Sequence, residues 1–379
     1  MTILAIAAAL FSGILLLLHL LSIAVAARRC RPRPLARPPR LLPAMTIVRP
    51  VCGLDNFLEE TLRTSFELSY PQFELIFCVA SARDPAIGVV DRLIASRPDI
   101  AARLIIGDER VSQNPKLNNC VKGWRAARYE WVVFADSNVL MPPDYLQRLL
   151  AAWQPDTGLV CSPPAGCRPV GFAANLECAF LNAYQARAQY FADWLGVGFA
   201  QGKTMMWRRA DLEAAGGIRA LGAEIAEDAA STKIVRTAGL RVRLTDGPFG
   251  QPLGRRTLGD VWRRQTRWGR LRRACFPLYF LPEILGGAVL PLTAAGFAAH
   301  GAGISPLSVV AGLAALWYGA EMVLVRTSGW HLTALYPLHA AIRDVLLPAL
   351  WVDAWVCTDF VWRGHQMSVA ADAPRAQTN

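Results

Sequence analysis

Charged residues are scarce in this chain. They make up 18% of its 379 residues, whereas a soluble globular protein carries about a quarter. Hydrophobic residues make up 53%, which excludes a disordered or low-complexity chain, because such chains bury too little apolar surface to fold. This balance favours a folded protein associated with a membrane.

The nine cysteines lack the spacing of a zinc site. Even the nearest pair, Cys161 and Cys167, is separated by five residues, and structural zinc sites use closer pairs. An odd number of scattered cysteines is typical of free thiols buried in a reducing compartment. We therefore expect free thiols.

Acidic residues are absent from two arginine-rich strips. Residues 28–40 hold six arginines and residues 263–273 hold six more. Without these twelve, 28 basic residues remain against 29 acidic ones, so the strips account for the net charge of +11. Each strip abuts a hydrophobic segment, as cytoplasmic anchors facing anionic lipid do. A nucleic-acid binder would spread its charge over a folded face, so we expect no nucleic-acid partner.

The first 27 residues contain no charged side chain. As a helix they would run about 40 Å, enough to cross a bilayer core of about 30 Å. The basic residues follow this run instead of preceding it, unlike in a signal peptide. We expect an uncleaved transmembrane anchor over 1–27, with the chain from Arg28 onward in the cytoplasm. A basic linker rich in proline and arginine follows over 28–43.

The C-terminal part of the chain is apolar again. Three segments are long enough to span a membrane or nearly so: Phe276–Ala299, Ile304–Val325 and Leu332–Val356. The third is interrupted by Arg343 and Asp344, which either pair with each other or place this region at the interface. We expect membrane helices over 276–362 and a tail over 363–379, hence a multi-pass protein of the plasma or inner membrane. The number of C-terminal crossings stays open.

Between these parts, short apolar runs alternate with stretches of helical period. The runs are Met45–Val48, Leu75–Val79, Leu104–Ile106 and Trp131–Ala135. This alternation predicts an α/β domain over 44–275 with a mostly parallel sheet. Ligands of such sheets bind beyond the carboxyl ends of the strands, so the residues that directly follow each strand are candidates for chemistry.

Carboxylates follow two of the predicted strands. Asp84 comes after the second run and before a proline, where a plain turn aspartate is the alternative. Asp136 and Asn138 follow the fourth run. Two oxygen ligands at that spacing can face one divalent cation, which would neutralise a diphosphate.

Three further groups of side chains stand out. Glu224, Glu227 and Asp228 precede a helical stretch; they either complement the helix dipole or supply a general base. Lys116, in the segment NPKLNN, is a potential phosphate contact. The second arginine strip contains Trp268, which suits a lipid anchor or the wall of a sugar site.

The order of these pieces resembles the processive-type inverting glycosyltransferases: an aspartate after a strand, a D-x-D-like triplet, a later E-D and R-x-x-R-W. The stretches RPVCGLD, FELSYPQFELIFCV, DPAI, ARLIIG, NPKLNN, GFAANLE and IAED resemble, more closely, the ceramide glucosyltransferases. The likeness runs from about Met45 to Trp268. It implies a GT-A, Rossmann-like, mostly parallel sheet flanked by transmembrane helices.

The resemblance also implies roles for particular residues. Asp84 would contact the nucleotide, Asp136 would hold the diphosphate through Mg²⁺ or Mn²⁺, and Asp228 would be the catalytic base. Arg264, Arg267 and Trp268 would close over the donor pyrophosphate and shape the acceptor site. One departure is that Asn138 offers an amide where a D-x-D enzyme has a second carboxylate, which lowers the charge of the expected metal site.

The expected reaction follows from these implied roles. A hexose, with glucose as the first candidate, passes from a UDP-sugar to the primary hydroxyl of ceramide, giving a β-glycosylceramide by a single inverting displacement. The catalytic domain faces the cytoplasm, and the lipid bilayer supplies the acceptor. Three alternatives remain: a hopanoid or diacylglycerol acceptor, a processive polysaccharide synthase, for which the membrane spans are few, and a catalytically silent scaffold.

Overall fold

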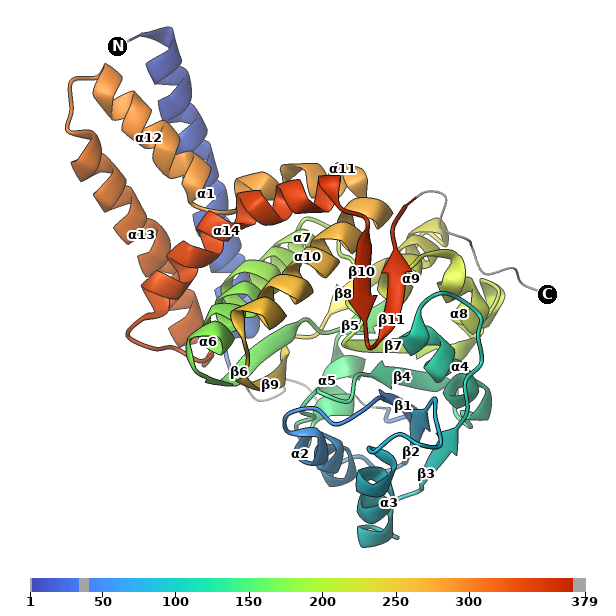
Figure 1. Cartoon of the computed structure of the whole chain (residues 1–379). Coiled ribbons are helices and arrows are strands. Elements are labelled where there is room, and N and C mark those ends of the chain that lie inside the picture. Colours follow the sequence, from blue (N-terminus) through green and yellow to red (C-terminus); the bar gives the residue numbers. More distant parts are fainter. Residues whose placement is uncertain (1, 34–40, 371–379) are drawn as a thin grey trace. The chain divides into compact units, whose positions relative to one another are not determined.

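The computed structural model describes residues 2–33 and 41–370, and the chain divides into two compact units (Figure 1). The first, here called the helical unit, comprises Met1–Pro32, Gly166–Phe191 and Arg255–Thr358. The second, the sheet unit, comprises Arg33–Ala165, Ala192–Gly254 and Asp359–Asn379. The expected linker over 28–43 lies partly outside the described residues.

The sheet unit is built on a seven-stranded sheet in the order β3-β2-β1-β4-β7-β5-β8. Its strands are β1 (Met45–Val51), β2 (Phe73–Val79), β3 (Ala102–Ile106), β4 (Trp131–Ala135), β5 (Thr157–Cys161), β7 (Thr204–Arg208) and β8 (Arg241–Leu244). Only β7 runs antiparallel to its neighbours, β4 and β5; the other pairings are parallel. The prediction of a mostly parallel sheet is confirmed.

Short helices connect and cover these strands. They are α2 (Leu58–Arg63), η1 (Thr64–Glu67), α3 (Ile87–Ser96), α4 (Pro115–Ala126), α5 (Tyr145–Ala151), α8 (Arg209–Ala214), η3 (Ile218–Ala223) and α9 (Glu227–Thr237). Every residue of β1 is buried, as expected of a central strand covered on both faces. At Gly123 of α4, an added Cβ would come within 2.5 Å of a methyl group of Val48 and 2.8 Å of the sulfur of Cys78. This glycine lets α4 pack closely on the sheet.

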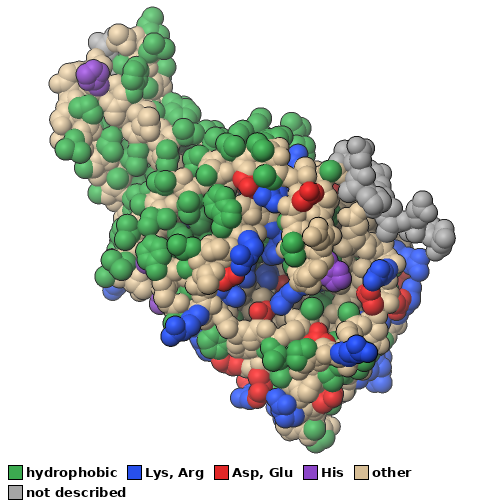
Figure 2. Space-filling model, viewed as in Figure 1, with side chains coloured by type: hydrophobic (Ala, Val, Ile, Leu, Met, Phe, Trp, Pro, Cys, Tyr) green, Lys and Arg blue, Asp and Glu red, His purple; other side chains and the backbone are tan. Residues whose placement is uncertain are grey.

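The helical unit contains the longest helices of the described chain. The helices of this unit are α1 (Ile3–Cys30), α6 (Phe172–Ala179), η2 (Phe180–Ala186), α10 (Leu258–Cys275), α11 (Pro277–Phe280), η4 (Leu281–Gly286), α12 (Val289–Gly301), α13 (Pro306–Thr327) and α14 (Tyr336–Val356). The chain leaves this unit through α7 (Arg187–Trp194). Hydrophobic side chains cover much of its visible face in Figure 2.

Two helices are long and apolar enough to cross a membrane, namely α1, of 28 residues, and α13, of 22. Residues Pro277–Gly286 and Val289–Gly301 together form a third candidate that is bent by 52°. Helix α14 is not among the candidates that the described residues provide. This helix has 21 residues, and Arg343, Asp344 and Asp353 interrupt its apolar sequence.

Arg343 and Asp344 of α14 pair with each other. The guanidinium of Arg343 lies 2.7 Å from Asp344 Oδ1 and 2.9 Å from Glu321 Oε1 of α13. The hydroxyl of Tyr336 donates to Glu321 Oε2 at 3.1 Å. All three charged side chains are fully buried, so the pairing first considered from the sequence is the one that forms.

Two of the remaining strands lie where the chain passes between the units, and two form a hairpin in the last segment of the sheet unit. β6 (Pro164–Val170) and β9 (Phe249–Arg255) lie where the chain passes from one unit to the other. β10 (Asp359–Trp362) and β11 (His365–Ser368) form an antiparallel hairpin where we had placed the last membrane residues and the start of a tail. Its turn residues Arg363 and Gly364 have φ values of 51° and 83°, which suits a tight hairpin turn.

Candidate active site

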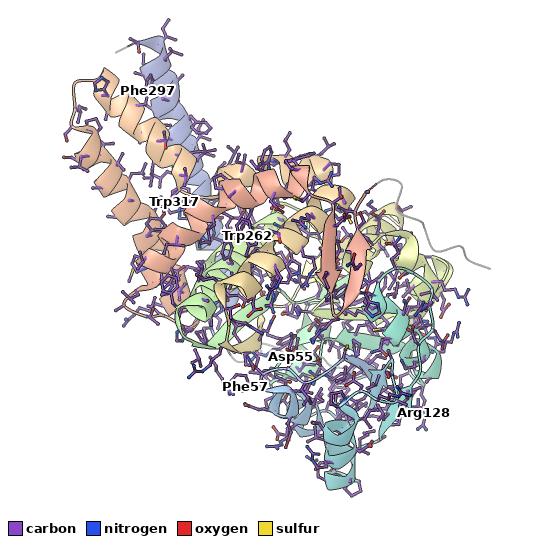
Figure 3. All side chains as sticks on the ribbon, viewed as in Figure 1. Asp55, Phe57, Arg128, Trp262, Phe297 and Trp317 are labelled. Atoms are coloured by element: carbon purple, nitrogen blue, oxygen red, sulfur yellow. The ribbon has the colours of Figure 1, made fainter. Side chains whose placement is uncertain are left out.

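Acidic and basic side chains from four segments of the sheet unit meet where β4 ends and α4 and α9 begin. Figure 3 draws the side chains as sticks on the ribbon and labels Asp55, in the loop after β1. Asp136 directly follows β4, and Lys116 lies in the first turn of α4. Glu227 and Asp228 open α9, and Lys203 directly precedes β7. We call these five residues the charged cluster. They include Asp136, Asp228 and Lys116, three of the residues expected from the sequence.

Asp136 is held by two lysines. Lys116 Nζ lies 2.7 Å from Asp136 Oδ1, and Lys203 Nζ lies 2.8 Å from Asp136 Oδ2. Burial alone would raise the pKa of Asp136, but the two ammonium groups outweigh it and hold that pKa well below its usual range. Asp136 is therefore an anion at any physiological pH.

Lys116 also binds a second carboxylate. Its ammonium lies 2.7 Å from Glu227 Oε1 and donates to the carbonyl oxygen of Gly202. Asn114, the N-cap of α4, accepts from the backbone N–H of Lys116 at 2.9 Å and donates to Glu227 Oε2 at 2.6 Å. Burial would lower the pKa of Lys116, but the carboxylates of Asp136 and Glu227 raise it overall. The segment NPKLNN thus supplies both a helix cap and a permanent positive charge.

Asp228 has the opposite electrostatic environment. Its Oδ2 accepts from the backbone N–H of Gly202 at 3.0 Å and its Oδ1 from that of Ala229 at 2.8 Å. Burial, followed by the nearby negative charge of Glu227, raises the pKa of Asp228 to about 6. A carboxylate with this pKa is mostly ionised at neutral pH and still basic enough to accept a proton, which suits a general base.

Gly202 packs among these charged groups. A Cβ at this position would lie 2.8 Å from Glu227 Oε1, 3.1 Å from Lys116 Nζ and 3.4 Å from Asp228 Oδ2. Any side chain here would push the charged groups apart. The sequence alone did not single out Gly202, because nothing in its neighbourhood reveals which side chains the fold brings around it.

Asn138 lies beside the charged cluster and contacts Lys203. Lys203 Nζ donates to Asn138 Oδ1 at 3.2 Å, and the backbone N–H of Asp136 donates to the carbonyl oxygen of Lys203 at 3.0 Å. The antiparallel pairing of Ala135 with Thr204 places the start of β7 beside the end of β4. Sequence reasoning missed Lys203, because the direction of a short strand cannot be derived from its own residues.

Asp84 lies in the loop after β2. Both of its carboxylate oxygens accept from the backbone N–H of Gly53, at 3.1 and 3.0 Å, and Oδ1 also accepts from that of Ala86 at 2.9 Å. Gly53 has a φ of 66°. Asp84 therefore fixes the loop that follows β1, and Asp55 in the same loop pairs with Arg363 of the hairpin at 2.7 Å.

The R-x-x-R-W residues lie on α10 of the helical unit. Arg264 forms an ion pair with Glu177 of α6, and Arg256 lies 3.5 Å from the same carboxylate. The guanidinium of Arg264 also lies 5.8 Å from the ring centroid of Trp268. Glu177 belongs to the stretch GFAANLE, to which the sequence analysis gave no separate role. Within the helical unit, Arg264 positions α10 against α6; Arg267 and Trp268 lie half-buried on the same helix.

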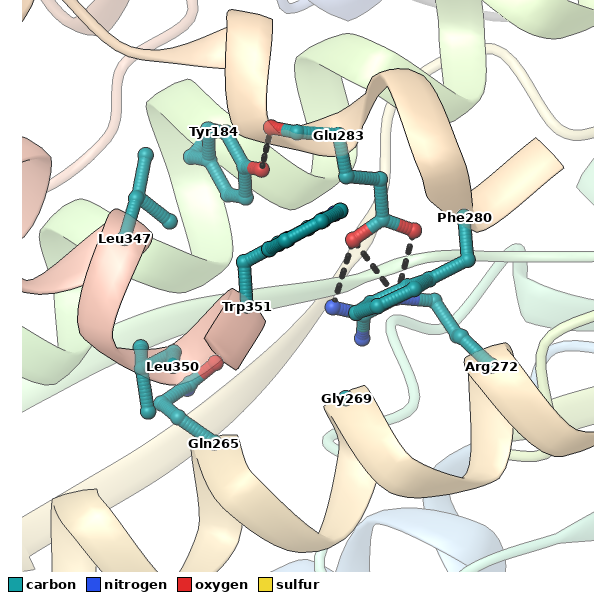
Figure 4. A pocket seen from close by; sticks show the side chains of 9 residues that line it. All are labelled: Tyr184, Gln265, Gly269, Arg272, Phe280, Glu283, Leu347, Leu350 and Trp351. Atoms are coloured by element: carbon teal, nitrogen blue, oxygen red, sulfur yellow. Dashed lines mark hydrogen bonds and ion pairs between the residues drawn. The ribbon is translucent and has the colours of Figure 1, made fainter. Parts of the chain in front are cut away.

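A pocket in the helical unit contains a different set of side chains (Figure 4). Arg272 and Glu283 form a bidentate ion pair, in which Nε donates to Oε1 at 2.8 Å and Nη2 donates to Oε2 at 2.8 Å. Leu347, Leu350 and Trp351 form an apolar wall. The charged side chains that line this pocket, Arg272 and Glu283, are thus paired with each other.

Comparisons with known proteins define the class of this fold. A solved structure, the mannosyltransferase PcManGT from Pyrobaculum calidifontis in complex with GDP-Man and Mn²⁺, matches with a TM-score of 0.53 and 20% identity, covering 90% of this chain and 99% of that chain. The mixed sheet of the sheet unit is thus the GT-A-like fold of glycosyltransferases, as predicted.

The family is defined by sequence. The model of Glycosyl transferase family 21 matches residues 13–374, so the chain belongs to that family and is a glycosyltransferase. Ceramide glucosyltransferase 1 of Caenorhabditis elegans is 27% identical over 376 residues, covering 97% of this chain and 80% of that protein. The ceramide glucosyltransferase of Komagataella phaffii is 39% identical over 118 residues, covering 30% of this chain and 23% of that protein. The resemblance that the motifs indicated is confirmed.

Proposed function

We propose that this chain transfers a hexose, with glucose as the first candidate, from a UDP-sugar to the primary hydroxyl of ceramide or a ceramide-like membrane lipid, with inversion. Both relatives described above are named ceramide glucosyltransferases, which supports glucose as the sugar and ceramide as the acceptor lipid. The observation that carries the proposal is that the fold brings Asp228, at the start of α9, beside Lys116 and Asp136, at the end of β4. Gly202 contacts Asp228 through its N–H and Lys116 through its carbonyl oxygen, and Lys116 contacts Asp136.

Asp228 acts as the general base of this reaction. Its ionised carboxylate removes the proton of the acceptor hydroxyl while the oxygen attacks the anomeric carbon from the face opposite the diphosphate. One bond forms as the bond to the diphosphate breaks, so an α-linked donor gives a β-glycoside. A general base of this kind typically contributes 10²–10⁴-fold to the rate.

Lys116 and Lys203 neutralise charge around the departing diphosphate. Both ammonium groups contact the carboxylate of Asp136, within 2.7 and 2.8 Å. Fixed positive groups at the place where negative charge develops stabilise a transition state, typically by about 3–4 kcal/mol for one such group. Asp84 organises the nucleotide end of this site through the loop that it holds.

The predicted Mg²⁺ or Mn²⁺ would be held by Asp136 and Asn138 and would supply positive charge to the diphosphate. The donor set fits such an ion poorly, because the ammonium of Lys203 already binds oxygens of both residues. We therefore route no step of the reaction through a metal.

Membrane attachment brings the enzyme to its acceptor. A lipid with two alkyl chains would lose about 0.8 kcal/mol for each CH₂ group drawn out of the bilayer. Helices α1 and α13 have the length and composition to hold the protein at the membrane. We propose that the chain from Arg28 onward faces the cytoplasm, and that Arg267 and Trp268 of α10 act on the donor and the acceptor.

Product analysis tests the proposal. Membranes containing the full chain are incubated with labelled UDP-glucose, UDP-galactose and a UDP-uronic acid, each with ceramide, diacylglycerol and a hopanoid polyol. We expect label in a lipid that carries one sugar, and none with Asp228→Asn. Label in a polysaccharide would favour the processive synthase, and transfer to diacylglycerol or the hopanoid alone would replace ceramide as the acceptor.

A further inference from the structure

Lys203 occupies the position that a metal ion would take in a D-x-D-type triplet. Its ammonium lies 2.8 Å from Asp136 Oδ2 and 3.2 Å from Asn138 Oδ1. These are the two side chains, two residues apart, that would face a divalent cation. The chain thus places a positive charge of its own between the expected metal ligands.

We propose that the ammonium of Lys203 is the built-in cation of the diphosphate site, so that this enzyme binds its donor nucleotide without a divalent metal ion. The inference rests on the proposed function, because the diphosphate belongs to the UDP-sugar that the proposal assigns. It adds a binding residue, Lys203, that the motifs of the chain do not predict, and it replaces the expected metal ion by an ammonium group.

The charge of the site argues against a metal ion beside Lys203. Asp136, Glu227 and ionised Asp228 carry three negative charges, and Lys116 and Lys203 carry two positive ones that pair with Asp136 and Glu227. A divalent ion on Asp136 would have to displace Lys203 and would then lie close to the ammonium of Lys116. Mg²⁺ is also held by carboxylates in near-octahedral geometry, whereas the third position of this triplet is the neutral amide of Asn138.

The backbone fixes Lys203 in this place. The N–H of Asp136 donates to the carbonyl oxygen of Lys203 at 3.0 Å, and the next residues of the two strands, Ala135 and Thr204, are register partners. The lysine is therefore attached to the triplet by the sheet itself, and its contact with Asp136 does not depend on a mobile loop.

A diphosphate can take over one of the contacts of Lys203. The amide oxygen of Asn138 is neutral, so it is a weaker acceptor for an ammonium group than an anionic phosphate oxygen. The side chains of Lys203 and Asp136 retain 14% and 19% of their exposure, which leaves the contact open to a ligand. If a phosphate oxygen replaces the amide oxygen of Asn138 as the acceptor, the ammonium of Lys203 keeps its contact with Asp136 and gains a contact with the phosphate.

Binding of UDP to the full chain in detergent, measured by calorimetry, tests this inference. One sample contains EDTA, the other contains Mn²⁺, and the metal content of the purified protein is measured by mass spectrometry. We expect affinities within about threefold of each other and no stoichiometric bound metal. Binding only in the presence of Mn²⁺ would overturn the inference while leaving the proposed function intact, and no binding in either sample would overturn both.

Two variants separate Lys203 from other lysines. Lys203→Met removes the charge and keeps the length of the side chain, so we expect UDP affinity in EDTA to fall tenfold or more. Lys233→Met is the matched control, because Lys233 pairs with Glu224 at the surface of the sheet unit, at 2.6 Å; its affinity should equal that of wild type. Thermal unfolding verifies that both variants fold. Unchanged affinity of folded Lys203→Met in EDTA would contradict the assigned role.

Discussion

The two units of this protein both bury charged side chains, but to different degrees. In the helical unit, the side chains of Arg343, Glu321 and Asp344 are 0% exposed. In the sheet unit, the side chains of Lys116, Lys203, Asp136 and Glu227 keep between 9% and 19% of their exposure. The first group is closed to solvent, whereas the second is partly exposed.

This difference separates a structural cluster from a reactive one. Arg343 joins α14 to α13 through Glu321 and donates a further hydrogen bond to the carbonyl oxygen of Ala179 at 3.2 Å. These contacts of Arg343 hold helices together. The charged cluster has an additional carboxylate, Asp228, whose pKa is raised to about 6. Access and a pKa near neutrality, rather than burial of charge as such, indicate chemistry.

The largest expected effect comes from opening the closed cluster. Arg343→Met leaves Glu321 and Asp344 buried without their cation, which typically costs about 3–5 kcal/mol. We expect little folded protein in detergent, measured by size-exclusion chromatography and thermal unfolding. Adding Glu321→Gln and Asp344→Asn to the same variant should restore part of the stability. If Arg343→Met were as stable as wild type, the structural role assigned to Arg343, Glu321 and Asp344 would be wrong.

Removing a lysine from the charged cluster of the sheet unit should lower stability less than Arg343→Met does, but it should weaken UDP binding. Lys116→Met takes one cation from Asp136 and Glu227, but Lys203 remains on Asp136 and Asn114 on Glu227. We expect a loss of about 1–3 kcal/mol, seen as a lower unfolding temperature, together with weaker UDP binding. If Lys116→Met were as destabilising as Arg343→Met, the distinction between the two clusters would fail.

The pH dependence should show opposite trends for rate and stability. Folding raises the pKa of Asp228 to about 6, above its ordinary value of about 4. The folded state therefore binds this proton more tightly than the unfolded state does. The resulting contribution to the free energy of unfolding is complete below about pH 4 and is lost as the pH rises to about 6. The transfer rate should rise over the same range, because the base must be ionised. Rates and unfolding temperatures at pH 4.5 to 8 test this; a rate independent of pH around 6 would be inconsistent with the assigned base.

The smallest effect is expected at the exposed pair of the hairpin. Arg363 and Asp55 lie 2.7 Å apart, but their side chains are 39% and 21% exposed. Such pairs contribute at most about 1 kcal/mol. We therefore expect the unfolding temperature of Arg363→Ala to lie within a few degrees of that of wild type. At high salt, which screens the ion pair, this small difference should disappear. A large loss of stability would show that the hairpin has a structural role comparable to the buried clusters.

Much of the sheet unit could be predicted from the sequence. The run Trp131–Ala135 coincides with β4, and the other three runs fall inside β1, β2 and β3, because buried parallel strands are short and continuously apolar. The rule that ligands bind at the carboxyl ends of such strands directed attention to Asp136. These features depend on local pattern alone.

The features that the sequence did not predict depend on tertiary pairing. The place of Lys203 follows from the antiparallel direction of β7. The pairing of Arg264 with Glu177 follows from how α10 packs on α6. The hairpin at Asp359–Ser368 followed a long apolar segment and was therefore mistaken for its end and a tail. In each case the partner is distant in sequence, and no local pattern identifies it.

Transfer by Asp228→Asn tests the central claim most directly. Its transfer rate and its UDP affinity are measured on one preparation of the full chain at pH 7.5, beside Asp99→Asn, which alters an exposed aspartate paired with Arg97. We predict that Asp228→Asn binds UDP as wild type does and loses about 10³-fold in rate, while Asp99→Asn loses neither. A folded Asp228→Asn protein that transfers sugar at the wild-type rate would contradict the account.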